Sequence, residues 1–182
     1  WSIALDQVDC VVHLAAIAHG KNESTDVEKE FEEVNTLGTL KLAEQSASAG
    51  VRRFVYISSI GVNGLFTEDP FKYSDAPNPQ EPYAVSKSEA EIGLRKISDE
   101  TGMEVVIIRP PLVYGANAPG NFGKFSDLSK KNLPLPLGAI NNKRSIVGID
   151  NLVDLISTCI DHPKAANQTF LVSDDHDVST SD

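Results

Sequence analysis

Cysteine, methionine and long hydrophobic runs are all scarce in this sequence of 182 residues. The two cysteines, Cys10 and Cys159, are too few for a disulfide framework. Their apolar neighbours predict buried free thiols in a reducing, cytoplasmic compartment. The apolar runs are short and interrupted by polar residues, so no membrane insertion is predicted. The four histidines lack the spacing of metal ligands, which predicts no metal site.

Positive charge is also in short supply. Lys and Arg total 16 against 26 Asp and Glu, which leaves a net charge of −10. A chain this acidic is a poor partner for nucleic acid or for an anionic membrane surface. The pair Arg52-Arg53 therefore indicates the entry to a strand rather than a binding patch. The hydrophobic content of 41% is ordinary for a globular protein with a real core.

An initiating methionine and a glycine-rich phosphate-binding turn are missing as well. The chain begins at Trp1 and its one methionine is Met103, so we expect a processed chain or an internal fragment. Neither G-x-G-x-x-G nor G-x-x-G-x-x-G occurs in the sequence. Such a turn, at the N-terminus of a helix, is what holds a dinucleotide's pyrophosphate.

The clearest chemical signal that is present is the stretch Glu81-Pro-Tyr-Ala-Val-Ser-Lys87. It places Tyr83 and Lys87 four residues apart in a helical pattern, and side chains at that spacing share one face of a helix. An ammonium beside a phenol favours the phenolate. The pair therefore predicts a tyrosine of lowered pKa that moves protons at an alcohol or ketone carbon. A surface tyrosine with a solvated lysine is the alternative that the pair alone leaves open.

Strand and helix patterns alternate along the first part of the chain. The nearly continuous apolar run Val8–Ala16 predicts a buried parallel strand ending in small residues, where open α/β sheets bind ligands. Further strands are predicted over 51–60, which ends in Ser58-Ser59, and over 103–111. Helices are predicted over 26–49 and 81–101. This alternation indicates right-handed crossovers and a parallel sheet.

The last part of the chain breaks that rhythm. After a loop over 114–123, the sequence predicts a helix over 122–131, a strand over 144–149, a helix over 150–161 and a strand over 168–173. The acidic residues 174–182 are expected to be disordered unless more chain follows. Within the first long helix, Asn35 is predicted to tie the helix to the sheet.

Taken in order, these pieces resemble the extended short-chain dehydrogenase/reductase family, in its branch of NAD-dependent nucleotide-sugar epimerases and dehydratases. Tyr83-x-x-x-Lys87 resembles the defining pair of the family, and Ser58-Ser59 resembles the serine pair of its fifth strand. Arg144 resembles the arginine that clamps the nucleotide-sugar diphosphate. Three further segments match in the same order, namely His13–Ala16, Val34–Thr39 and Arg109–Gly115.

The resemblance implies an α/β fold, an incomplete Rossmann-type parallel sheet without its N-terminal strands and with part of a small substrate-binding region. Residues 1–115 would form the C-terminal part of a dinucleotide-binding domain. Residues 116–182 would be truncated substrate-binding segments interleaved with the last core elements. The absent opening would amount to roughly 60 residues. A homodimer through the helices over 26–49 and 81–101 is also implied.

The resemblance further implies a UDP-sugar substrate and NAD as the cofactor, with NADP left open because the discriminating strand end is missing. Tyr83 would be the acid/base at the sugar's C4 oxygen, Lys87 would hold the nicotinamide ribose, and Ser59 would share the hydrogen bond to that oxygen. The other implied cofactor contacts are Leu14, Ala15, Ala16, Ser58 and Pro110. The other implied substrate contacts are Asn121 and Arg144.

Three functions stay open at this point. The first is an NAD(P)-dependent epimerase that acts at C4 of a UDP-sugar through a 4-keto intermediate. The second is an NAD(P)H-dependent reductase of a UDP-4-keto-6-deoxy-N-acetylhexosamine, and the third is a non-catalytic dinucleotide-binding scaffold or an inactive fragment. Segments Leu133–Gly138 and Arg144–Ile149 resemble bacterial enzymes of surface-polysaccharide sugar synthesis, including UDP-glucose 4-epimerase-like proteins. Leu112, Ser145 and Asn151 depart from the family's Asn, Asp and Asp, which favours the reductase.

Overall fold

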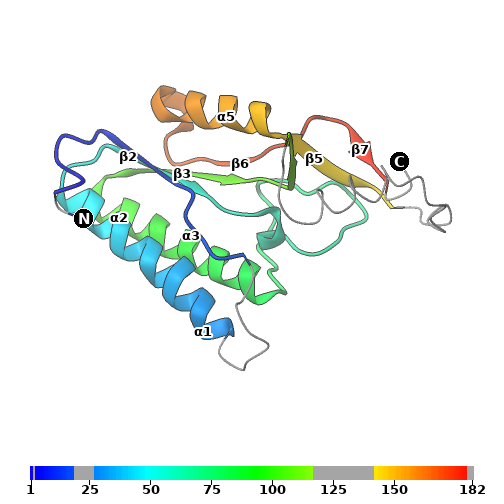
Figure 1. Ribbon diagram of the computed structural model, residues 1–182, viewed down its shortest axis with the longest axis horizontal. Coiled ribbons are helices and arrows are strands. Elements are labelled where there is room, and N and C mark those ends of the chain that lie inside the picture. Colours follow the sequence, from blue (N-terminus) through cyan, green and yellow to red (C-terminus); the bar gives the residue numbers. More distant parts are fainter. Residues whose placement is uncertain (2, 19–26, 117–141, 180–182) are drawn as a thin grey trace. The chain divides into compact units, whose positions relative to one another are not determined.

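The structure, a computed structural model, describes residues 1, 3–18, 27–116 and 142–179 (Figure 1). The chain forms two compact units. Unit 1 comprises Trp1–Arg109 and Ile156–Leu171, and unit 2 comprises Pro110–Leu155 and Val172–Asp182. Each unit is described by itself below.

Unit 1 is an α/β structure built on a parallel sheet, as the alternating pattern predicted. Its strands, in sheet order, are β1 (Cys10–His13), β2 (Arg53–Ile57), β3 (Glu104–Arg109) and β6 (Thr169–Leu171). Every neighbouring pair is parallel. Its helices are α1 (Val27–Phe31), the π-helical η1 (Glu32–Leu37), α2 (Gly38–Ser48) and α3 (Pro82–Thr101), with 3₁₀ turns η2 (Ile60–Val62) and η3 (Pro163–Ala165).

The core of unit 1 lies between the sheet and the helices α2 and α3. Alternate residues of β2 and β3 contribute to it because successive side chains of a strand point to opposite faces. The cluster consists of Leu5, Ala43, Val51, Phe54, Tyr56, Ala90, Leu94, Ile97, Met103, Val105 and Ile107. Val55 and Val106, on the opposite face, are also fully buried, so both faces of the central strands are covered.

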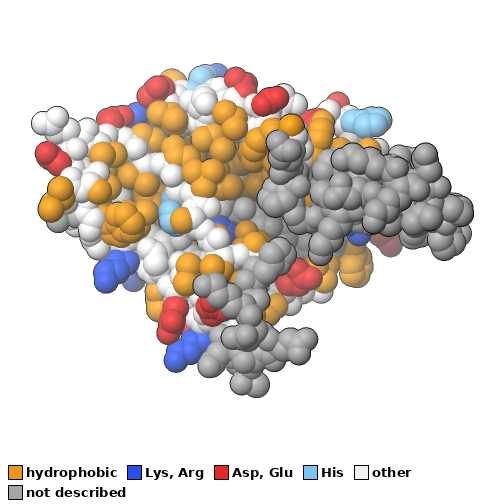
Figure 2. Space-filling view, viewed as in Figure 1, with side chains coloured by type: hydrophobic (Ala, Val, Ile, Leu, Met, Phe, Trp, Pro, Cys, Tyr) orange, Lys and Arg blue, Asp and Glu red, His pale blue; other side chains and the backbone are white. Residues whose placement is uncertain are grey.

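Strand β1 forms one edge of this sheet and is shorter than the predicted run Val8–Ala16. All four of its residues are only half-buried, because an edge strand has one neighbour instead of two. Hydrophobic side chains are visible across the part of unit 1 where Figure 1 draws the start of the chain and β2 (Figure 2).

Backbone signals in the sequence set the ends of the helices correctly. Pro82 occupies the first turn of α3, and Gly102 ends that helix in the left-handed region at φ 79°. Gly50 follows α2 at φ 80°. Gly93 lets α2 and α3 pack closely, since a Cβ there would lie 2.5 Å from the Leu40 Cδ2 atom.

The two arginines at the start of β2 are structural, as expected. Arg53 is 1% exposed, and its Nη1 donates to the carbonyl oxygens of Cys159, Ile160 and His162. These carbonyls lie at and just beyond the C-terminal end of helix α5 (Ile149–Asp161), where they have no partner within the helix. Cys159 is a buried free thiol, whereas Cys10 is also free but half-exposed, contrary to the prediction that both are buried.

Unit 2 contains a three-stranded sheet in the order β4 (Leu112–Tyr114), β5 (Arg144–Gly148) and β7 (Asp177–Val178). The pair β4–β5 is parallel and the pair β5–β7 is antiparallel. Helix α5 (Ile149–Asp161) starts in this unit and ends in unit 1. No helix among the described residues has the length and apolar composition that crossing a bilayer requires.

Two predictions for this part of the chain were incomplete or wrong. The sequence did not predict β4, and it predicted disorder over 174–182, where the described residues 174–179 include β7. The polar side chains there hydrogen-bond to β5 and α5; for example, Ser145 donates to Asp177 at 2.7 Å, and Asn151 donates to Asp174 at 2.8 Å. The predicted helix over 122–131, the extended segment Leu133–Gly138 and the candidate Asn121 lie outside the described residues.

Candidate active site

Tyr83 and Lys87 lie on one face of α3, as their spacing predicted. The Lys87 Nζ atom is 5.8 Å from the ring centroid of Tyr83 and 4.6 Å from that of Tyr56 in β2. The ammonium donates a hydrogen bond of 2.8 Å to the Ile57 carbonyl oxygen. Lys87 is only 2% exposed, which is inconsistent with a solvated surface lysine.

Burial shifts the pKa values of both groups of the pair. It lowers the pKa of Lys87 to about 8, and the nearby Glu91 carboxylate opposes that shift. Burial raises the pKa of Tyr83, whose ring packs edge-on against Phe31 at 6.0 Å between centroids. The prediction that Lys87 lowers the pKa of the phenol is therefore wrong for this structure. Desolvation of the phenolate outweighs an ammonium whose hydrogen bond goes to Ile57.

The two serines after β2 serve different purposes. The Ser59 hydroxyl accepts a hydrogen bond of 3.2 Å from the Gly61 amide and so caps the turn η2. A Cβ on Gly61 would lie 3.3 Å from the Ala84 Cβ and 3.4 Å from the Ser59 Oγ. The turn that carries Ser59 thus packs on the first turn of α3, beside Tyr83. Ser58 is buried, and its hydroxyl donates to Glu91.

The segment that follows β1 is held in place by hydrogen bonds from a buried asparagine. Leu14 is 62% exposed, Ala15 is exposed and Ala16 is half-buried. One residue further on, the Asn35 side chain accepts from the Ile17 amide at 2.9 Å and donates to the Ile17 carbonyl at 3.0 Å. The same amide donates to Ser86 of α3. Asn35 therefore ties η1 to the segment after β1 and to α3, and not to a strand of the sheet as predicted.

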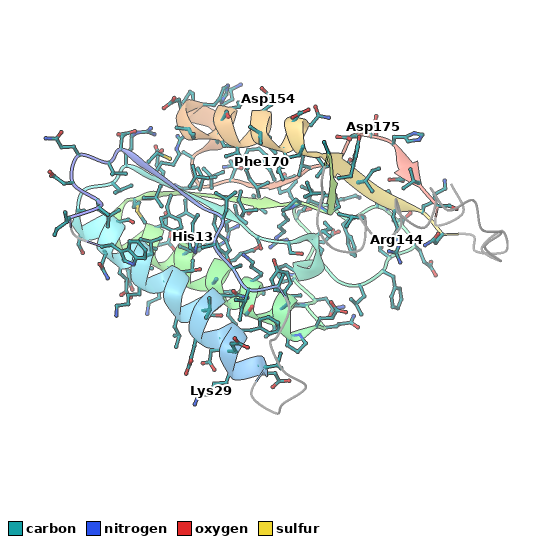
Figure 3. All side chains as sticks on the ribbon, in the orientation of Figure 1. His13, Lys29, Arg144, Asp154, Phe170 and Asp175 are labelled. Atoms are coloured by element: carbon teal, nitrogen blue, oxygen red, sulfur yellow. The ribbon has the colours of Figure 1, made fainter. Side chains whose placement is uncertain are left out.

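The tie depends on an irregular helix that the sequence did not predict. Asn35 and Thr36 are both buried within the π-helical η1, and π-helical turns often occur at functional sites. Thr36 donates to the Ser86 carbonyl at 2.9 Å. One turn later, Thr39 lies 3.0 Å from the Nε2 atom of His13, which Figure 3 labels. The His13 ring stacks on Tyr56 at 6.0 Å between centroids. Burial and the Lys87 charge lower the pKa of His13.

A buried ion pair beneath this site was missed by the sequence reasoning. Glu91 and Arg109 are each 4% exposed in their side chains, and Arg109 Nη2 donates to Glu91 Oε2 at 2.6 Å. Arg109 Nε donates to Glu91 Oε1 at 3.0 Å, and its Nη1 donates to Asn63 at 2.9 Å. The signal that could have revealed Glu91 is its position, four residues after Lys87 on the same helix face.

Two candidate residues belong to unit 2. Pro110 is buried just before β4, and Arg144 is exposed at the start of β5 (Figure 3). In the same unit, the Asp174 carboxylate accepts from the Tyr114 hydroxyl at 2.7 Å, the Gly148 amide at 2.9 Å and the Asn151 side chain at 2.8 Å. These donors lower the pKa of Asp174, and the carboxylate raises the pKa of Tyr114.

Comparison with known proteins gives the context for this geometry. Residues 2–173 match the NAD dependent epimerase/dehydratase family. A protein of Vibrio cholerae named UDP-glucose 4-epimerase is 52% identical over 100% of this chain and 57% of its own length. The chain thus spans little more than half of that relative.

Solved structures show the same fold. The dTDP-glucose 4,6-dehydratase of Streptomyces venezuelae, solved with NAD, is 26% identical, with a TM-score of 0.84 over 99% of this chain and 56% of that one. The UDP-glucuronic acid 4-epimerase of Bacillus cereus, 22% identical, shares the fold with a TM-score of 0.86 over 100% of this chain and 59% of that one. With its Rossmann-like sheet and its match over residues 2–173, the chain belongs to the NAD dependent epimerase/dehydratase family, a family of enzymes.

Proposed function

We propose that the protein carrying this chain is an NAD(P)-dependent epimerase that inverts C4 of a UDP-sugar through a 4-keto intermediate. The observation that carries the proposal is the convergence of Tyr83 and Lys87 on one face of α3, beside the turn of Ser59. The name of the Vibrio cholerae relative favours an epimerase over the reductase that Leu112, Ser145 and Asn151 suggested.

The residues present fit a dinucleotide. The chain after β1 has small side chains and an exposed Leu14, so a ligand can approach its backbone. The proposed cofactor contacts are Leu14, Ala15, Ala16, Tyr83, Lys87 and Pro110, with Ser58 restricted to its backbone because Glu91 holds its hydroxyl. When bound, the nicotinamide would take a hydride from C4 and return it. NAD in solved relatives favours NAD over NADP.

The chain's own groups would handle the proton. Tyr83, as phenolate, would accept the C4 hydroxyl proton while the carbon is oxidised and return it when the ketone is reduced. The Lys87 ammonium would stabilise the phenolate, and the Ser59 hydroxyl would donate to the C4 oxygen. Because burial raises the pKa of Tyr83, the phenolate is scarce at neutral pH and the rate should rise with pH. Arg144 and Asn121 are the proposed contacts to the substrate's diphosphate.

The proposal is tested by a Tyr83→Phe change in the intact protein. Interconversion of UDP-glucose and UDP-galactose should fall by about a hundredfold to ten-thousandfold, because the acid/base is lost. Tyr73→Phe is the matched control, since Tyr73 is 67% exposed and outside the site. Retention of turnover by Tyr83→Phe would refute the acid/base role, whereas absence of turnover in the intact wild-type protein would favour the scaffold alternative.

We also propose a homodimer through helices α1–α2 and α3. Hydrophobic side chains are exposed on η1, between α1 and α2, and on α3. They are Val34 and Leu37 of η1 and Val85 and Ile92 of α3, and Ile92 is 66% exposed. Exposed apolar residues grouped on neighbouring helices are typical of an interface. An Ile92→Glu change should convert the dimer to a monomer in sedimentation velocity. A wild-type protein that sediments as a monomer would contradict the proposal.

A further inference from the structure

The next residue on the catalytic face of α3 after Tyr83 and Lys87 is Glu91. Its carboxylate collects three hydrogen bonds, two from Arg109 of β3 and one of 2.5 Å from the Ser58 hydroxyl at the end of β2. It is 3% exposed, so none of these bonds is shared with bulk water. Glu91 therefore joins the helix that carries the candidate acid/base to the ends of two strands.

The contacts made by Lys87 and Glu91 are in register with each other. Lys87 donates to the carbonyl of Ile57, the last residue of β2, and Glu91 accepts from the hydroxyl of Ser58, the residue directly after the strand. Two side chains one helical turn apart thus hold two consecutive residues where β2 ends. Ser59 follows immediately, so the same contacts set the position of α3 along β2 and the placement of Tyr83 relative to Ser59.

The network also reaches the loop after η2. Arg109 Nη1 donates to the Asn63 side-chain oxygen, and the Asn63 amide donates to the Lys72 carbonyl at 3.2 Å. Apolar side chains would fill the same space at a lower desolvation cost, since buried ion pairs are weak contributors to stability. A charged pair at this position calls for a purpose other than packing.

The charges around Lys87 supply that purpose. The groups that face its ammonium are His13 from β1, Tyr56 from β2, Tyr83 and Glu91 from α3, and Arg109 of β3 through its pair with Glu91. Glu91 is the only carboxylate in this set. The Tyr56 and Tyr83 rings interact with the Lys87 ammonium through their faces.

We propose that Glu91 is a positioning residue for the Tyr83–Lys87 pair, fixing α3 against the end of β2 so that Tyr83 and Lys87 stay beside Ser59. This inference rests on the proposed function, because it assigns Glu91 a purpose only if the pair carries out proton transfer. The Glu91 carboxylate touches neither sugar nor cofactor in this scheme and acts through Lys87 and Ser58.

The test is a Glu91→Gln change in the intact protein, with Glu100→Gln as the control on the same helix. Glu100 is exposed and makes only a surface pair with Lys96. NMR titration of the lysine side chains, with Lys87 assigned by Lys87→Arg, should show a lower titration midpoint for Lys87 in Glu91→Gln. The kcat should fall by about tenfold to a hundredfold with little change in KM. In the wild type, the rise of kcat with pH should end where Lys87 loses its proton, and in Glu91→Gln this limit should lie at lower pH.

A double variant keeps the test decisive if the single variant does not fold. Glu91→Gln/Arg109→Gln leaves no unpaired buried charge, so it avoids the cost of an uncompensated buried ion. The Lys87 midpoint should again be lowered, because the opposing carboxylate is gone. A midpoint and a kcat profile equal to those of Glu100→Gln, in whichever variant folds, would overturn the proposal. The Lys87 titration midpoint is measured without turnover. The proposed function can therefore be refuted by the activity of Tyr83→Phe while the effect of Glu91 on Lys87 is still measured separately.

Discussion

Two carboxylates, one in each unit, accept hydrogen bonds from residues far apart in the sequence, yet their surroundings differ. Glu91 in unit 1 is buried and faces a guanidinium. Asp174 in unit 2 is half-buried, and its donors among the described residues are all neutral, namely a phenol, a backbone amide and a side-chain amide. The first site cannot exchange its partners for water, whereas the second can.

This difference determines how much stability is lost when a partner of each carboxylate is removed. Removing the partner of a buried charge leaves the full desolvation penalty, whereas a solvent-accessible carboxylate is rehydrated. In unit 1, the buried Glu91–Arg109 pair lies on the helix that carries the candidate acid/base. In unit 2, the Asp174 contacts hold its small sheet together. Three substitutions test this contrast.

The largest expected effect is on stability, from Arg109→Gln. The change leaves the Glu91 carboxylate buried without its cation and should lower the free energy of unfolding by about 3–5 kcal/mol. Urea unfolding followed by circular dichroism measures it, with the exposed Lys96→Gln as the control. The double variant Glu91→Gln/Arg109→Gln should recover most of the loss. A single variant as stable as the control would show that water reaches this pair after all.

The second effect has the opposite sign and comes from Lys87→Met. The folded-state pKa of about 8 lies below the ordinary 10.5, so the folded state binds fewer protons between those values. Wild-type stability should therefore rise as pH increases from 8 to 10.5, and at neutral pH the buried ammonium costs roughly 3 kcal/mol. Losing the bond to Ile57 offsets part of this, so Lys87→Met should gain about 1–2 kcal/mol at pH 7.

Thermal unfolding at pH 7 and pH 10 measures the change, and the pH-dependent rise should be absent from Lys87→Met. Lys96→Met, on the exposed side of the same helix, should keep the wild-type profile. If Lys87→Met retains the rise in stability between these pH values, Lys87 is not its source. Loss of turnover together with gained stability would show that unit 1 trades stability for its site.

Local sequence signals predicted the elements and the catalytic face but not the electrostatics. The spacing of Tyr83 and Lys87 and the stop at Gly102 depend on neighbours within one helix, so they could be read directly. The pairing of Glu91 with Arg109 requires knowing which strand end meets α3, and no local pattern encodes that. The pKa of Tyr83 was predicted with the wrong sign because burial, a tertiary property, outweighs the nearby ammonium.

The same limit explains the missed parts of unit 2 and of the first helix. Strand β7 has two residues, too few for an alternating pattern, and it is held through polar contacts that composition alone reads as disorder. In the π-helical turn, the Asn35 side chain hydrogen-bonds to Ile17 and Ser86, which are 18 and 51 residues away in the sequence. Irregular backbone that depends on such distant contacts cannot be predicted from local sequence patterns.

The smallest expected effect comes from Asp174→Asn, which alters unit 2 locally. The wild-type carboxylate raises the pKa of Tyr114 by accepting its hydrogen bond and by its charge. The amide should therefore let the Tyr114 pKa fall towards its ordinary value, and the Gly148 amide should exchange faster. Stability of unit 1 should stay as it is. NMR titration of tyrosines labelled at Cζ, with amide hydrogen exchange, measures both.

Asp175→Asn is the matched control, because the neighbouring aspartate is exposed and asparagine accepts its backbone φ of 57° (Figure 3). The pH dependence adds a second test. Since its donors lower the pKa of Asp174, the wild-type contacts persist as pH falls below the ordinary 3.8 and are lost only as the carboxylate protonates. Asp174→Asn should lack that acid step in Gly148 protection. Equal titration midpoints for Tyr114 in the two variants would mean that the Asp174 carboxylate does not set the Tyr114 pKa. The contrast with Glu91 would then not hold.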